Sequence, residues 1–130
     1  MADIDRGNRP LSPHLQVYKW PLNMAMSILH RITGVAIGAM VALLALWFLA
    51  LASGPEAYSW ANALAMSWLG ILILLGGLVS IWFHFANGLR HLVWDTGSGL
   101  GQKRVRRSAI AGIVTVLVLT ALTLWVAVSV

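Results

Sequence analysis

The segment that decides the fold is HFANGLRHLVWD, residues 84–95, which follows a long apolar run. At about 100° per residue, one face of a helix here carries Gly77, Ser80, His84, Gly88, His91 and Asp95 within roughly 40° of His84. That face therefore holds two histidines two turns apart, with small residues beside the first. A glycine one turn from a histidine leaves room for a flat group to lie against the backbone.

Charged residues are few and clustered. They make up 10% of a chain that is 59% hydrophobic, and none occurs between Arg31 and Glu56, between Glu56 and Arg90, or after Arg107. Each gap can hold a membrane-spanning helix of about 20 residues. The sequence predicts an all-α membrane protein with three transmembrane helices in a single membrane-anchor domain. After an arm of residues 1–21, we expect the helices at about 22–52, about 60–95 and about 106–129.

The basic residues lie at the ends of apolar runs, which is typical of a membrane protein and argues against nucleic-acid binding. Two sets lie on one predicted side, Arg6, Arg9 and Lys19 in the arm, and Lys103, Arg104, Arg106 and Arg107 after the second helix. The positive-inside rule places the N-terminus and this second loop in the cytoplasm and the C-terminus outside. Tyr58 and Trp60 are expected in a short outer loop, as an aromatic belt.

Cysteine is absent from the sequence, which excludes a disulfide framework and a thiolate-bound iron–sulfur cluster in this chain. Asp3 and Asp5 precede any apolar run, so we expect neither a cleavable signal peptide nor a mitochondrial transit peptide. Prolines at 10, 13 and 21 predict an extended arm. His14, within that arm, is interpreted as a surface or partner-contact residue.

The first predicted helix carries four polar or small residues on one face, Ser27, Arg31, Gly34 and Gly38. The four-residue spacing of the two glycines predicts a helix–helix packing face. Arg31 lies roughly 15 Å along the helix, where a charge is costly unless it reaches the interface. The residues alone leave open whether Arg31 has a functional role or anchors the helix at the membrane surface.

His84 has two readings from the residues alone. It is a histidine hydrogen-bonded to a neighbouring helix, or it is a neutral imidazole that binds haem iron, with Ser80 and Gly88 making room. His30, Arg31 and His91 could then receive the anionic haem propionates. No second histidine is expected at the depth of His84 on the first or third helix. A second histidine ligand would therefore come from another chain.

Ser27 and Arg31 lie one turn apart, so their side chains can converge on one acceptor such as a quinone carbonyl. Alone, this pair is not a specific signal. Asp95 has two readings, in proton delivery or in a salt bridge with Arg90 or the basic loop, and the salt bridge is favoured.

Two motifs carry a family resemblance. The first is Arg9-Pro10-Leu11 followed by SILHRITG at 27–34, and the second is His84-xxx-Gly88 continuing as LRHLVWDTG to residue 97. With the three-helix layout, they cover most of the chain. The sequence resembles the cytochrome b556 subunit family of succinate dehydrogenase, one of the two membrane anchors of respiratory complex II.

The resemblance implies that His84 is one axial ligand of haem b and that a second anchor subunit supplies the other. It implies that Ser27 and Arg31 line the ubiquinone site, with His30 and Arg31 near the haem propionates. It also implies that a flavoprotein and an iron–sulfur subunit dock on the cytoplasmic face and pass electrons from succinate to ubiquinone. The N-terminal arm is similar to that of proteobacterial members, so a bacterial inner membrane is expected, with the mitochondrial inner membrane as the alternative.

Two other functions compete with this reading. One is a haem-free structural anchor that only holds soluble oxidoreductase subunits at the membrane. The other is a small transporter or channel subunit, which would predict repeated or broken helices with polar groups at the membrane midplane. The sequence shows no internal repeat and its polar groups gather at one end, so the transporter ranks last.

Overall fold

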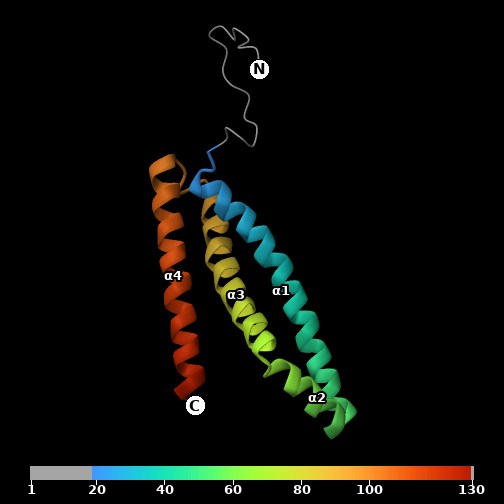
Figure 1. Cartoon of the computed structure of the whole chain (residues 1–130). Coiled ribbons are helices and arrows are strands. Elements are labelled where there is room, and N and C mark those ends of the chain that lie inside the picture. The colour runs from blue at the N-terminus through green and yellow to red at the C-terminus, as the bar shows by residue number, and fades with distance from the viewer. Residues whose placement is uncertain (1–18, 130) are drawn as a thin grey trace, which may run out of the picture.

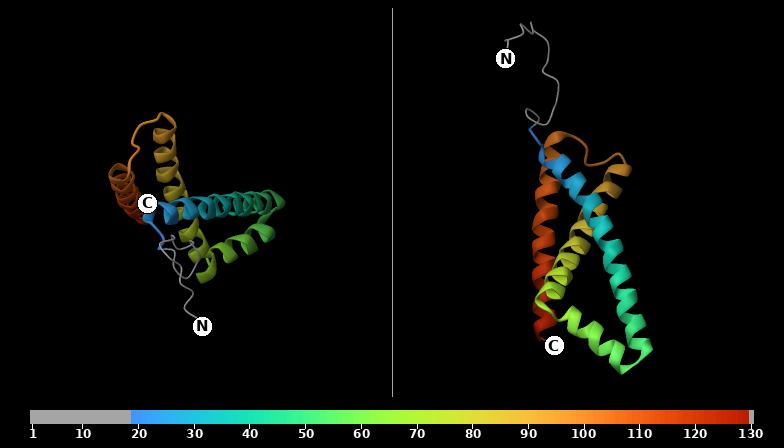
Figure 2. Two further views of the ribbon diagram at one scale, coloured as in Figure 1. Left: turned by 90° about the horizontal axis from the view of Figure 1, so that it is seen from above. Right: turned by 45° about the vertical axis from the view of Figure 1, so that its right-hand side comes forward.

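Helices make up nearly all of residues 19–129, the part of the chain that the computed structural model describes. Their order is α1 (Leu22–Ser53), α2 (Pro55–Ala65), α3 (Trp68–Asp95) and α4 (Gln102–Ser129). Figure 1 shows α3 between α1 and α4, with α2 returning the chain from the far end of α1 to the start of α3. Figure 2 shows that α1 and α3 cross at an angle, with the start of α1 beside the start of α4. Most of the predicted arm, including His14, lies outside the described residues.

Three of these helices, α1, α3 and α4, are long and apolar enough to cross a membrane. At 1.5 Å per residue they are about 48, 42 and 42 Å long, more than the roughly 30 Å of hydrocarbon in a bilayer. Helices suit such a chain because lipid offers no hydrogen-bond partner to backbone groups, which must be satisfied within the segment. The predicted class, an all-α membrane protein with three spans, is confirmed.

The predicted second helix, about 60–95, is wrong in one respect, because the chain breaks at residues 66–67 into α2 and α3. The Ser67 hydroxyl donates to the Leu64 carbonyl at 2.6 Å and accepts from the Gly70 N–H at 3.1 Å. It thus closes α2 and caps α3. Serine before an apolar run is a helix-start signal, but the surrounding apolar residues concealed it.

The predicted outer loop around Tyr58 and Trp60 is also wrong, since both residues lie in α2. A single residue, Gly54, separates α1 from α2, and its φ of +117° suits glycine. Pro55 then occupies the first turn of α2, where its missing N–H costs no hydrogen bond. The Tyr58 ring still packs edge-on against Trp47 of α1, at 5.5 Å between centroids.

Few side chains are buried in the described part of the chain. The buried apolar residues are Met26, Ala86, Ala109 and Val116, and the buried polar or charged residues are Ser80, Asn87 and Arg90. Between α3 and α4, the Trp82 indole N–H donates to Thr123 Oγ1 at 3.0 Å. Large apolar side chains elsewhere on the three long helices are exposed. These faces therefore need lipid or another protein to cover them.

We expect Ser67→Ala to open the junction between α2 and α3, because it removes both bonds of the cap. Loss of an N-cap costs about 1 kcal/mol, which corresponds to roughly fivefold faster local amide exchange. Hydrogen–deuterium exchange of the peptide covering residues 66–72 measures this. Ser59→Ala is the control, since Ser59 only bonds the Glu56 carbonyl within α2. Equal exchange in both variants would contradict the capping role.

Candidate functional site

The start of α1, the end of α3 and the start of α4 meet at one end of the molecule (Figure 1). We call this the basic end, because it carries Lys19 and the four basic residues Lys103, Arg104, Arg106 and Arg107. The chain from α3 to α4 passes through Gly97, Gly99 and Gly101, all with positive φ. Glu56, in α2, is the one charged residue described at the opposite end.

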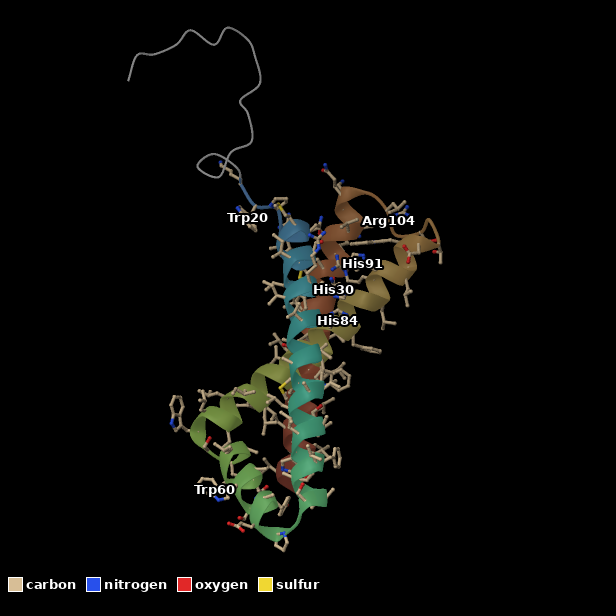
Figure 3. The ribbon with its side chains drawn as sticks, turned by 90° about the vertical axis from the view of Figure 1, so that its right-hand side faces the viewer. Trp20, His30, Trp60, His84, His91 and Arg104 are labelled. Carbon is tan, nitrogen blue, oxygen red and sulfur yellow. The ribbon has the colours of Figure 1, made fainter. Side chains whose placement is uncertain are left out.

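Three histidine rings form a column between α1 and α3 toward the basic end (Figure 3). His30 of α1 stacks on His84 of α3, with 3.8 Å between centroids and 15° between planes. The His30 ring also lies near the ring of His91, with 5.2 Å between centroids. The His91 ring in turn packs edge-on against Trp94, at 5.0 Å between centroids. The structure thus brings together three of the histidines predicted for the site.

The stacking corrects one expectation about depth. No second histidine was predicted level with His84 on the first helix, yet His30 lies directly against it. The sequence gives the position of a residue along its own helix, but the level at which two helices face each other depends on how they cross. Here that crossing brings His30 between His84 and His91.

The hydrogen bonds of His84 fix which ring nitrogen carries the proton. His84 Nδ1 lies 3.0 Å from the main-chain carbonyl oxygen of His30 and 3.4 Å from Thr33 Oγ1. A carbonyl oxygen can only accept, so Nδ1–H donates and the neutral ring keeps its lone pair on Nε2. No hydrogen bond to Nε2 is found among residues 19–129. Metal-binding histidines commonly show this arrangement, with one nitrogen held by a carbonyl and the other available.

A polar atom without a partner lies beside this ring. His30 Nδ1 is buried and makes no hydrogen bond within residues 19–129. A buried polar nitrogen left unpaired is costly, so this position fits a hydrogen-bonding group supplied from outside the chain. Among the same residues, no group of three histidine or acidic side chains is arranged to hold a metal ion.

The glycines near the histidines differ in their surroundings. A Cβ built on Gly34 would lie 3.0 Å from His84 Cε1, and one on Gly88 would lie 3.9 Å from His30 Cε1. A Cβ on Gly38 would meet nothing within 4 Å. Among residues 19–129, the predicted packing face is therefore used at Gly34 alone, and packing of another chain at Gly38 stays a prediction.

Ser27 and Arg31, the predicted quinone pair, lie on either side of His30 along α1. Ser27 is half-buried and Arg31 is exposed. Their placement on the basic end agrees with the expected gathering of polar groups there. Whether the two side chains converge on one acceptor stays a prediction.

Arg90 is buried between α3 and α4, and its contacts correct the favoured salt bridge with Asp95. Its guanidinium donates to Asn87 Oδ1, to Ser108 Oγ at 3.3 Å and to the Val105 carbonyl at 3.4 Å. It also lies 4.9 Å from the centroid of Trp94. All three acceptors are neutral. Pairing of Asp95 with the basic loop, and its role in proton delivery, stay predictions.

Sequence reasoning missed Asn87, which is 2% exposed and is the polar residue most deeply buried in the described chain. Its amide N–H donates to the Met26 carbonyl of α1 at 3.5 Å, and its oxygen accepts from Arg90, which itself bonds residues of α4. The available signal was a lone asparagine in an apolar run, three residues before an arginine and therefore on its helical face.

A cavity of about 320 Å³ lies between the end of α3 and the start of α4. Its lining includes Arg90, Val93, Trp94, Arg104 and Ser108. None of the predicted haem or quinone residues lines it, so it is distinct from the histidine column.

Comparison with known proteins gives a consistent family. The sequence model of one protein family, the succinate dehydrogenase/fumarate reductase transmembrane subunit, matches residues 5–124. The succinate dehydrogenase cytochrome b556 subunit of Paracoccus denitrificans is 46% identical over 97% of this chain and 99% of its own length. The cytochrome b556 subunit of Rickettsia felis is 40% identical over 91% of both chains. The mitochondrial cytochrome b560 subunit of Sus scrofa is 42% identical over 88% of this chain and 67% of its own.

We expect Arg90→Ala to loosen α4 from α3, because it removes the guanidinium that bonds Ser108 and the Val105 carbonyl of α4, and to leave the buried Asn87 amide oxygen without its donor. An unsatisfied buried polar group costs about 1–3 kcal/mol. The melting temperature of the purified protein with its natural partners should fall by several degrees. Arg104→Ala removes the same charge from an exposed side chain and should change it little. A fall in melting temperature for Arg90→Ala no larger than that for Arg104→Ala would contradict the role of Arg90 in joining α3 to α4.

Proposed function

Since the chain belongs to the family of succinate dehydrogenase and fumarate reductase transmembrane subunits, we propose that it is a membrane anchor of succinate dehydrogenase. In this role it binds haem b jointly with a second anchor subunit and contributes to the reduction of ubiquinone. The chain is an integral membrane protein. The observation that carries the proposal is the state of His84, whose Nδ1–H donates to a backbone carbonyl and leaves Nε2 to bind iron.

His84 is proposed as one axial ligand of the haem iron, and the relatives named cytochrome b556 support a haem of the b type. His30 is the nearest histidine, but it cannot be the second ligand. The rings of His30 and His84 stack face to face with 3.8 Å between centroids, which leaves no room for an iron atom between them. The second ligand is therefore assigned to the partner anchor.

The other residues of the column hold the cofactor. The unpartnered His30 Nδ1, when it carries the proton, can donate a hydrogen bond to a propionate, and His91 and Arg31 add positive or hydrogen-bonding groups at the same end. Gly88 is proposed to keep the space beside the haem free of a side chain. When bound, haem b supplies reversible one-electron transfer.

Ser27 and Arg31 are proposed to bind ubiquinone. A hydroxyl donor and a guanidinium on one carbonyl oxygen stabilise the negative charge that develops as the quinone is reduced. Ubiquinone takes up two electrons and two protons to become ubiquinol. The electrons come from succinate through a flavoprotein subunit and an iron–sulfur subunit, and the dicarboxylate and flavin sites lie outside this chain.

The exposed apolar faces and the charges support a place in a membrane complex. The second anchor subunit and lipid cover the apolar faces of α1, α3 and α4. The positive-inside rule places the basic end in the cytoplasm, where the soluble subunits dock, and the C-terminus in the periplasm. A bacterial inner membrane is the proposed location, with the mitochondrial inner membrane as the alternative.

We expect His84→Ala to remove the haem without preventing insertion, because the change makes a membrane helix less polar. A reduced-minus-oxidised optical spectrum of the complex, purified through a tag on this chain, measures haem. The co-purified soluble subunits are the control for assembly. An unchanged haem signal in this variant would refute the ligand assignment. A haem-free wild-type complex with full succinate–quinone activity would instead establish a haem-free anchor.

We expect Arg31→Ala to slow ubiquinone reduction about ten- to hundredfold, the range for losing a charged hydrogen bond of about 1.5–3 kcal/mol. Electron flow from succinate to a water-soluble artificial acceptor should stay near the wild-type rate, because it does not use the quinone site. Ser27→Ala, which removes a neutral donor, should have a smaller effect. Equal loss with both acceptors would indicate a defect in assembly instead.

A further inference from the structure

One turn of α1 makes every described polar contact of the His84 ring. The His30 carbonyl and Thr33 Oγ1 both face Nδ1, at 3.0 and 3.4 Å. Thr33 Oγ1 also donates to the same His30 carbonyl at 3.0 Å, so its own lone pairs are free to accept from Nδ1–H. The ring thus meets two oxygen acceptors held in a fixed relation by one helix.

Gly34 lies at the same edge of the ring. A methyl group there would be 3.0 Å from His84 Cε1 and 3.5 Å from Nδ1. Non-bonded carbons prefer about 3.5–4.0 Å, so the ring would have to move away from α1 by a few tenths of an ångström. Such a movement lengthens both contacts to Nδ1. The absence of a side chain at residue 34 is therefore a condition for these hydrogen bonds.

We infer that Thr33 and Gly34 are positioning residues for the iron ligand, an inference that rests on the proposed role of His84. Gly34 admits the edge of the imidazole close to α1, and Thr33 together with the His30 carbonyl fixes its orientation and tautomer. Hydrogen bonds to the far nitrogen make a histidine a more basic ligand, which favours the oxidised iron. Weakening these bonds should therefore raise the reduction potential of the haem.

A plain packing role for the two glycines makes a different prediction. Gly34 and Gly38 lie on one face of α1, one turn apart, yet a Cβ on Gly38 meets nothing within 4 Å. If Gly34 served only to let the helices approach, Gly34→Ala would lower stability but leave the potential and the spectrum of the haem at their wild-type values. The comparison of Gly34→Ala with Gly38→Ala isolates contact with the His84 ring.

The experiment uses the complete complex, purified through a tag on this chain. Potentiometric titration gives the haem potential, and electron paramagnetic resonance of the oxidised haem reports the orientation of its imidazole ligands. Gly34→Ala should raise the potential and shift the largest g value. Gly38→Ala should match the wild type in both measurements.

Thr33 gives an independent test that does not require a larger side chain. Thr33→Val removes the hydroxyl while keeping the shape, and should raise the potential by less than Gly34→Ala because the His30 carbonyl remains. Thr33→Ser keeps the hydroxyl and should restore the wild-type potential. If the complex with Gly34→Ala does not assemble, Thr33→Val and Thr33→Ser still test whether these α1 residues position the His84 ring.

The outcomes separate this inference from the proposed function. Wild-type potentials and resonance signals in Gly34→Ala and Thr33→Val, with His84→Ala still losing haem, would overturn the positioning roles and leave the ligand assignment in place. Retention of haem by His84→Ala would overturn the proposed function itself. Equal shifts in Thr33→Val and Thr33→Ser would also overturn the role of the Thr33 hydroxyl.

Discussion

The hydrogen bond from His84 Nδ1 to the main-chain carbonyl of His30 joins α1 to α3 within the column of three histidine rings. The acceptor belongs to a helix backbone, so its position follows from the helix and not from a mobile side chain. Once this bond is formed, the stacking of His30 on His84 and the availability of Nε2 follow from it. The close approach of residue 34 is what allows the two helices to make it.

The rest of the bundle has little to stabilise it alone. Small residues and one methionine make up most of its buried interior, and Asn87 and Arg90 add a polar connection among the helices. Arg90 donates to Asn87, Ser108 and the Val105 carbonyl, so these buried polar groups are hydrogen-bonded, and an unpaired group there would be costly. The large apolar faces of α1, α3 and α4 are exposed and need lipid or another protein to cover them.

The three spans could be predicted because charge-free runs of sufficient length have few alternatives in a membrane. The polar face of residues 84–95 could be predicted because helical periodicity places residues on faces. The break at Ser67 was missed because the apolar run continues across it. The contacts of His30 with His84, and of Arg90 with Ser108, depend on how separate helices cross, which periodicity within one helix does not contain. Roles of Ser27, Arg31 and Gly88 involve molecules outside this chain and stay predictions.

The two connections at opposite ends of the spans differ in how much extended backbone they offer. Between α1 and α3, helix α2 leaves only Gly54 and residues 66–67 outside helical structure. Between α3 and α4, residues 96–101 form a longer irregular stretch with three glycines at positive φ. Proteases cleave exposed, irregular loop tips in preference to helices. Wherever partners leave both connections accessible, we expect proteases to cut the glycine-rich connection first, because helix α2 makes up most of the other one.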